Sequence, residues 1–174
     1  MTIYQKITSR NTPVINSPIE NGFLEQHNRP DVRKTHLFEG RYENIYLNEQ
    51  HIPALQPLLD EAIELAEVIL DRKNLRAGYW FNYMPPGAMT TLHTHDDDDE
   101  LLSCVYYVKV PENSGNLIIY NDADNLIQNK IEIESRTGDF IFFKPDIRHE
   151  VTKNNSSEFR LSLAFNFGLN KQTD

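Results

Sequence analysis

The fold of this chain is decided by the stretch FRLSLAFNF, residues 159–167. Its large apolar residues occupy every second position, and the positions between them form a second face that includes Arg160 and Ser162. A period of two residues predicts a β-strand with one face in an apolar core. The other face then places an arginine inside the protein, where an unpaired charge is costly and requires a partner.

Seven runs of the same kind lie upstream of this strand. They are short, rich in Val, Ile, Phe and Tyr, and separated by turn residues, which is typical of strands in an all-β domain. Eight short strands with no helix between them predict a mainly β protein, a jelly roll or double-stranded β-helix of two packed sheets. The ranges that we expect to be strands are 78–84, 89–95, 101–110, 115–120, 129–135, 139–144, 147–152 and 159–167.

The N-terminal part of the chain has a different pattern. Residues 1–50 are mixed and polar, with prolines that interrupt any long element, although 40–47 could be a strand. Between residues 53 and 74, apolar residues recur at steps of three and four, which predicts an amphipathic helix that begins at Pro53 or Pro57 and ends near Asn74. We expect this helix to cover an edge of the sheet.

The length and composition favour one globular domain. A chain of 174 residues fits a single domain, with an N-terminal extension and cover helix at 1–77 and a jelly-roll core at 78–168. The net charge of −9 argues against a nucleic acid or an anionic membrane as the main partner. Its only cysteine, Cys104, excludes an internal disulfide. We find no signal peptide or membrane-spanning run and expect a cytoplasmic protein.

Histidines and carboxylates gather at the end of the second predicted strand. His93, His95 and Asp97 point to one side if the strand extends that far, and His149 follows a turn that can bring it opposite them. Two ligand sets compete. The set of His95, Asp97 and His149 has the two histidines and one carboxylate of non-heme Fe(II) oxygenases, and we prefer it. The alternative is His93, His95 and His149, to which Glu100 could add a carboxylate. The other histidines lack this context, and we interpret them as surface or packing residues: His27, His36 and His51.

Arg160 indicates what the cavity binds. A guanidinium group can hold a carboxylate with two hydrogen bonds, and Ser162 can add a third. The alternative is a structural ion pair, for which Asp139 and Glu150 are the candidate partners.

With these residues assembled, the chain resembles the Fe(II)/2-oxoglutarate-dependent dioxygenases, nearest the prolyl-hydroxylase-like group, over residues 78–168. The resemblance implies that His95, Asp97 and His149 hold iron and that Arg160 and Ser162 bind the distal carboxylate of 2-oxoglutarate. It also points to Tyr83 as a contact of the co-substrate, with Asn82 as the alternative in the opposite phase. The motifs that carry the resemblance are YWFNYMPPG at 79–87, His95-x-Asp97, LSCVYYV at 102–108, SGNL at 114–117, GDFIFFKP at 138–145, His149 and Arg160-x-Ser162.

Some of the same residues also resemble the two metal motifs of cupins, which share the barrel. These are Gly87 followed by His93-x-His95-x4-Glu100, and Gly138 followed by a proline and His149.

We therefore expect an oxygenase that uses Fe(II), 2-oxoglutarate and O₂, with ascorbate as a candidate reductant, to hydroxylate a small molecule or a peptide side chain. The first alternative is a cupin-type metalloprotein with three histidines, either a dioxygenase or an isomerase that does not use 2-oxoglutarate. The second is a jelly-roll binding module without catalysis. An acidic rim, formed by the run from Asp96 to Glu100, would favour a cationic or neutral substrate over an anionic one.

Overall fold

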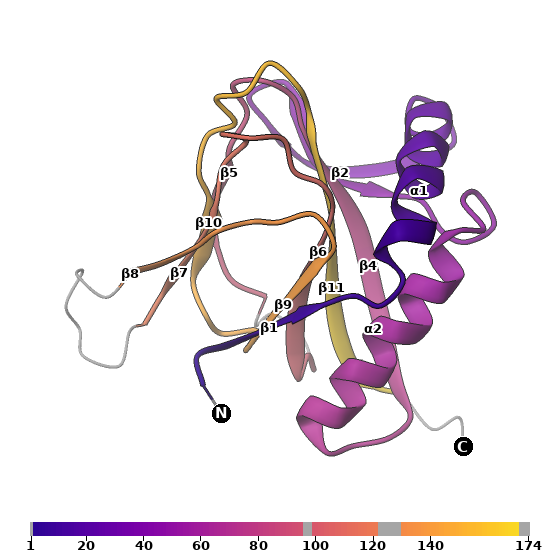
Figure 1. The fold of residues 1–174 in the computed structure, drawn as a ribbon, viewed down its shortest axis with the longest axis vertical. Helices are drawn as coiled ribbons and strands as arrows, with labels where there is room; N and C mark the ends of the chain where they lie inside the picture. Colours follow the sequence, from indigo (N-terminus) through magenta and orange to yellow (C-terminus); the bar gives the residue numbers. More distant parts are fainter. Residues whose placement is uncertain (1, 96–98, 122–129, 171–174) are drawn as a thin grey trace.

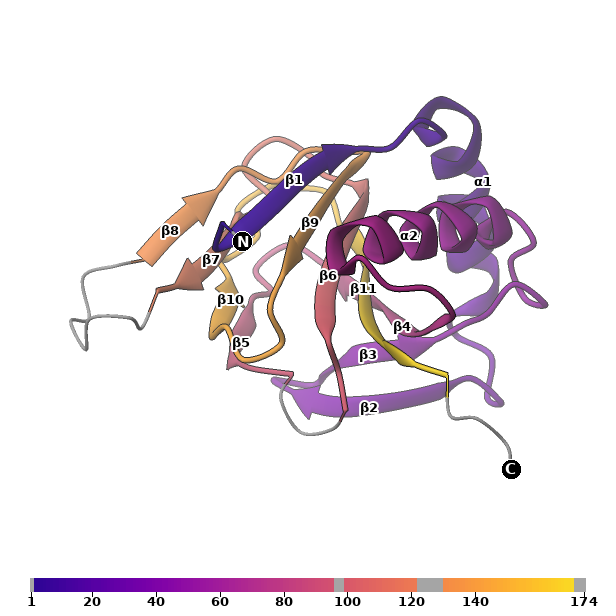
Figure 2. The ribbon, with the colours of Figure 1, turned by 90° about the horizontal axis from the view of Figure 1, so that it is seen from below.

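The computed structural model describes residues 2–95, 99–121 and 130–170, and in them two antiparallel sheets face each other, with two helices outside the larger sheet (Figures 1 and 2). This arrangement confirms the mainly β jelly roll. The larger sheet contains, in order, β1 (Tyr4–Thr8), β9 (Asp139–Phe143), β6 (Leu102–Lys109), β11 (Arg160–Leu169), β4 (Leu75–Met84), β3 (Arg41–Tyr46) and β2 (Arg33–Phe38). The smaller sheet contains β5 (Thr90–His93), β10 (His149–Val151), β7 (Leu117–Tyr120) and β8 (Lys130–Ile133).

Strand β11 lies at the centre of the larger sheet, between β4 and β6. Its register with β4 runs from Arg160 opposite Met84 to Leu169 opposite Leu75. As its alternation predicts, its apolar side chains pack in the core beneath the helices, whereas Arg160, Ser162, Ala164 and Asn166 line a cavity between the two sheets. The strand thus separates a dry core from the functional site.

The helices α1 (Thr12–Gln26) and α2 (Leu55–Leu70) pack on the outer face of the larger sheet (Figure 2). The expectation that the second helix covers a sheet edge is therefore wrong, because its buried residues meet the apolar face of β4 and its neighbours. It begins at Leu55 and ends at Leu70, before Asn74, since Asp71 adopts a left-handed conformation with φ of 50°. Its apolar stripe needed a broad partner surface, which a face supplies and an edge does not.

The first 50 residues contain more regular structure than their prolines suggest. Helix α1 tolerates Pro13 because this residue lies in the first turn, where no N–H partner is needed. Pro18 lies on the exposed side of the helix, where water can bind the carbonyl that loses its partner. The opposite side buries Ile15, Ile19 and Phe23 at steps of four.

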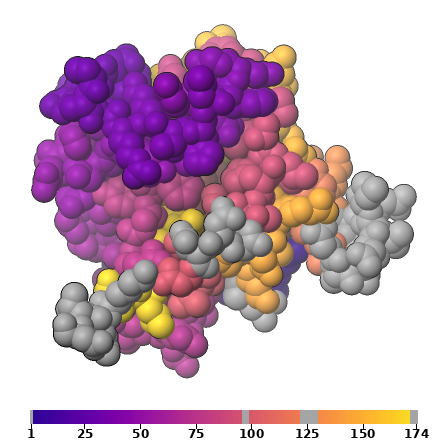
Figure 3. All heavy atoms as spheres, turned by 180° about the vertical axis from the view of Figure 1, so that it is seen from behind, coloured from indigo at the N-terminus to yellow at the C-terminus, as the bar shows by residue number. Residues whose placement is uncertain are grey.

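The N-terminal strands lie at both edges of the larger sheet. Strand β1 pairs with β9, and β3 pairs with β4. Seen from behind, the indigo and violet atoms of the first part of the chain cover the upper left of the molecule (Figure 3). In the part of the chain that the structure describes, no helix is long and apolar enough to cross a membrane.

Candidate metal centre and its cavity

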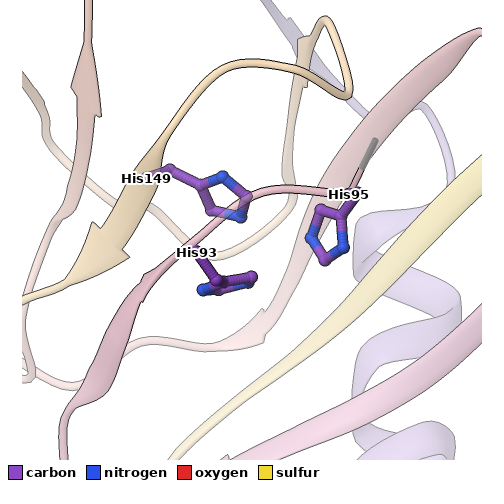
Figure 4. A group of neighbouring side chains, drawn as sticks. All are labelled: His93, His95 and His149. Carbon is purple, nitrogen blue, oxygen red and sulfur yellow. The ribbon is translucent and has the colours of Figure 1, made fainter. Parts of the chain in front are cut away.

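Three histidines meet at the inner face of the smaller sheet (Figure 4). His93 is the last residue of β5 and lies opposite His149, the first residue of β10. His95 follows two residues after β5, where its backbone N–H donates to the carbonyl of Pro145 at 2.8 Å. The ring centroids are 4.2 Å apart for His93 and His149, and 4.9 Å apart for each of the other two pairs. One nitrogen from each ring lies within 4.8 Å of the others, so the cluster can hold a metal ion.

The environment of the rings favours the form that binds a metal. Nδ1 of His149 lies 2.9 Å from the carbonyl of Ile147, and Nδ1 of His93 lies 2.7 Å from that of Thr91. A carbonyl can only accept, so each Nδ1 carries a proton, and in the neutral form of the ring the lone pair is on Nε2. Burial, and to a smaller extent the other two histidines, lowers the pKa of His149 to about 3. This ring is therefore neutral at neutral pH.

The preferred ligand Asp97 lies outside the described residues. Its role as the carboxylate of the site stays a prediction, as does the choice between Asp97 and His93 as third ligand. Glu100 lines the same cavity but does not belong to the group of three residues that approach one another within 4.8 Å. His36, which we interpreted as a surface residue, is exposed and also lines the cavity.

The cavity beside the histidines has a volume of about 490 Å³. One wall consists of the inner faces of β11 and β4, and the opposite wall of β5 and β10. Arg160 forms part of this lining and is only 1% exposed. The cavity therefore joins a potential metal site to a buried cation.

Arg160 has no carboxylate partner among the described residues. Its Nη2 donates to Oγ of Ser135 at 3.0 Å, and its Nη1 lies 3.4 Å from the sulfur of Met84. Its Nε is buried without a hydrogen bond, and burial lowers the pKa of the group. The prediction of an ion pair between Arg160 and Asp139 or Glu150 is wrong. Asp139 pairs with Lys6, and Glu150 accepts a hydrogen bond from the hydroxyl of Tyr120. The guanidinium thus keeps its capacity for an anion.

Tyr107 is a residue of this site that sequence reasoning missed. Its ring lies beneath the guanidinium of Arg160, with Cζ 4.9 Å from the ring centroid, and its backbone lies opposite Ser162. The hydroxyl is fully buried and has no hydrogen-bond partner among the described residues. Burial raises the pKa of Tyr107, so the group remains a donor at neutral pH. A buried cation next to an orphaned hydroxyl fits a carboxylate ligand.

Tyr83 does not take the place that we expected. Its ring packs against Phe23 and Phe159 on the helix side of the sheet. The prediction that Tyr83 contacts the cavity is therefore wrong, because its side chain lies on the opposite face of β4. Asn82, the alternative, does line the cavity. Its amide is engaged by Arg41 and Thr90, at 3.2 Å each.

The fold and the site define a jelly roll in which three clustered histidines and a buried arginine line one cavity. Residues 78–166 match the protein family described as "Putative 2OG-Fe(II) oxygenase". Because this match covers half of the 174 residues, the chain belongs to the 2-oxoglutarate- and Fe(II)-dependent oxygenases, as its motifs predicted.

Solved structures support the same fold. A prolyl-4-hydroxylase from Pseudomonas putida superimposes with a TM-score of 0.66 at 17% identity, over 97% of this chain and 89% of its own. A 2OG-Fe(II) oxygenase family oxidoreductase from Burkholderia pseudomallei gives 0.69 at 15% identity, over 99% and 89%. SnoK, an alpha-ketoglutarate-dependent carbocyclase from nogalamycin biosynthesis, gives 0.71 at 15% identity, over 95% and 79%. A search of curated proteins gives no match.

Proposed function

We propose that this protein uses Fe(II), 2-oxoglutarate and O₂ to hydroxylate a small molecule or a peptide side chain. The observation that carries the proposal is the buried Arg160, which has no carboxylate partner among the described residues and lines the same cavity as three histidines. When bound, the iron and the co-substrate supply O₂-dependent oxidation, with succinate and CO₂ as products of 2-oxoglutarate. The protein supplies binding, orientation and the exclusion of water.

The distal carboxylate of 2-oxoglutarate is expected to bind Arg160. The guanidinium offers a fork of donors, and its Nε is free of protein partners in the described residues. Ser162, on the same face of β11, and the hydroxyl of Tyr107 complete the pocket. These groups are held by the central strands of the sheet and not by loops, so the pocket exists before the ligand arrives.

We propose His93, His95 and His149 as the metal ligands, because one nitrogen of each ring lies within 4.8 Å of the others. The Nδ1 atoms of His93 and His149 are held by backbone carbonyls, which directs their Nε2 atoms to a metal. His95, Asp97 and His149 form the alternative set. A three-histidine site would also suit the cupin alternative, but a cupin that does not bind a 2-oxo acid has no use for the cation at Arg160. This residue therefore favours the oxygenase over both the cupin enzyme and the non-catalytic module.

The proposal is tested by anaerobic titration of the full chain with Fe(II) and 2-oxoglutarate. We expect a visible metal-to-ligand absorption band that requires both additions. After admission of O₂, with ascorbate as reductant, we expect slow release of succinate without any further substrate. If Fe(II) binds but 2-oxoglutarate neither produces the band nor is consumed, the proposed reaction is wrong.

A further inference from the structure

We propose that the substrate carries an ammonium or guanidinium group and that Glu100 binds it. This inference rests on the proposed function, because it assigns the part of the same cavity that 2-oxoglutarate does not use. Three observations support it: the unsatisfied carboxylate of Glu100, the distance of Glu100 from Arg160 measured along the neighbouring strand β11, and the aromatic side chains in the same cavity.

The Glu100 carboxylate is only half satisfied. Its Oε1 accepts from Nη1 of Arg76 at 3.4 Å, a long hydrogen bond. Its Oε2 is buried and has no hydrogen-bond partner among the described residues, and the side chain as a whole is 11% exposed. A buried carboxylate oxygen without a hydrogen-bond donor costs free energy. A ligand that donates a hydrogen bond to Oε2 would recover it.

The charge around Glu100 is not balanced. Arg76 forms ion pairs with Asp99 and with Glu100, so two carboxylates share one guanidinium. The other carboxylate in the cavity lining, Glu43, has its own partner in Arg41, 3.1 Å away. Glu100 therefore has only a share of one guanidinium to balance its own charge. A neutral hydroxyl could fill the hydrogen bond but would not neutralise this charge, whereas a cation does both.

The position of Glu100 separates it from the co-substrate. Asn166 is the cavity-facing residue of β11 near this end, since Phe167 accepts from the backbone N–H of Leu101, next to Glu100. Arg160 lies six residues before Asn166 on β11, and six residues of an extended strand span about 20 Å. The five-carbon chain of 2-oxoglutarate cannot span that distance.

The histidines lie between these two ends. Trp80 stands opposite Ala164, which lies between Arg160 and Asn166 and nearer to Asn166, and its ring centroid is 5.5 Å from that of His95. A co-substrate that reaches from Arg160 to the metal thus leaves the space on the Glu100 side for the substrate. The cation anchors the substrate there, and the carbon to be oxidised extends toward the histidines.

An aromatic wall adds to the preference for a cation. Trp80 lines the cavity, and its ring lies 6.5 Å from that of Tyr46, which lines it as well. The face of an indole attracts ammonium and guanidinium groups and does not attract carboxylates. The same Trp80 is the only tryptophan of the chain, so its fluorescence reports on binding in the cavity without any need for turnover.

The experiment compares matched probes by titration of Trp80 fluorescence. The protein is measured without metal, and again with Fe(II) and saturating 2-oxoglutarate under anaerobic conditions, when Arg160 is occupied. The cationic probes are 1,4-diaminobutane and butylguanidine, the neutral ones 1,4-butanediol and butylurea, and the anionic one adipate. Capped tripeptides with a central lysine or arginine, set against norleucine and citrulline, distinguish a peptide side chain from a small molecule as the source of the cation.

We expect saturable binding of the cationic probes, at least about tenfold tighter than that of the neutral ones, or about 1.4 kcal/mol. Glu100→Gln should remove this preference, while Glu25→Gln, at an exposed position of α1, should retain it. Equal binding of cationic and neutral probes by the wild-type protein overturns the inference, and so does a preference that survives in a folded Glu100→Gln variant. A failure of the proposed function shows itself separately, as the absence of the Fe(II)–2-oxoglutarate band, and leaves the metal-free titration intact.

Discussion

The two ends of the cavity each contain a buried charged side chain, but the surroundings of the two charges differ. At the Arg160 end, the cation is 1% exposed and its contacts are neutral: Met84 on β4, Tyr107 on β6 and Ser135 after β8. At the Glu100 end, the carboxylate precedes β6 and keeps a partly exposed partner, Arg76. The closed, neutral surroundings suit a small co-substrate that never changes. The loop-borne, partly open end is where a fold of this kind can vary its substrate.

The largest effect should come from the centre that both ends share. His149→Ala should abolish metal binding, because it removes a buried ligand that is in both candidate sets. The loss is measured by calorimetric titration with a divalent metal and by the absence of the Fe(II)–2-oxoglutarate band. Normal metal affinity in this variant would mean that the histidines are not the metal site.

The third ligand is decided by comparing two further variants in the same titration. If the three histidines are the ligands, His93→Ala should lose most of its metal affinity and Asp97→Ala should keep it. The reverse result would establish the set with the carboxylate. His36→Ala, which changes an exposed histidine at the cavity lining, is the matched control and should behave as the wild type.

The next effect is confined to the cationic end. Arg160→Ala should raise the dissociation constant of 2-oxoglutarate at least about tenfold, since a hydrogen bond to a charged group contributes about 1.5–3 kcal/mol. Metal affinity should remain nearly unchanged. Arg160→Lys should restore part of the affinity, because lysine keeps the charge but cannot present two parallel donors. Arg29→Ala, at an exposed ion pair, serves as control; an unaltered 2-oxoglutarate affinity in Arg160→Ala would show that Arg160 is structural.

The residues that line the cavity from β11 can be predicted from the sequence better than those from the other strands. In β11 one face is apolar and the other is not, so the alternation alone places Arg160 and Ser162 in the cavity. In β6 both faces are buried, and a strand buried on both sides loses its period-two signal. The pair of Tyr106 and Tyr107 therefore gives no indication of which ring faces Arg160. The choice of Tyr83 came from the family resemblance, and β4, which has aromatic residues in both phases, offers no pattern that could have corrected it.

Helix α1 was missed for another reason. Its prolines lie at the two kinds of position where a helix tolerates them, the first turn and the exposed face. The spacing of Ile15, Ile19 and Phe23 was the available signal. The state of Glu100 could not have been predicted, since it depends on how Arg76, 24 residues earlier in the chain, divides its guanidinium between two carboxylates.

A smaller effect should follow from Tyr107→Phe. The hydroxyl contributes one neutral donor to the carboxylate pocket, and such a hydrogen bond contributes about 0.5–1.5 kcal/mol. We expect the dissociation constant of 2-oxoglutarate to rise by about two- to tenfold. The ligand-free variant should be at least as stable as the wild type in thermal unfolding, because the removed hydroxyl has no partner among the described residues. A clear loss of stability would mean that the hydroxyl supports the fold instead.

The smallest effect is expected for Tyr83→Phe, the counterpart of that variant on the other side of the sheet. The ring of Tyr83 packs against Phe23, Phe159 and His27, and phenylalanine keeps these contacts. Because the side chain faces away from the cavity, the 2-oxoglutarate affinity should stay within about twofold of the wild-type value, well below one tenfold step of about 1.4 kcal/mol. Measured beside Tyr107→Phe in the same titration, the pair assigns the co-substrate hydroxyl to one face of the sheet. If Tyr83→Phe weakens binding more than Tyr107→Phe does, the pocket at Arg160 is not where 2-oxoglutarate binds.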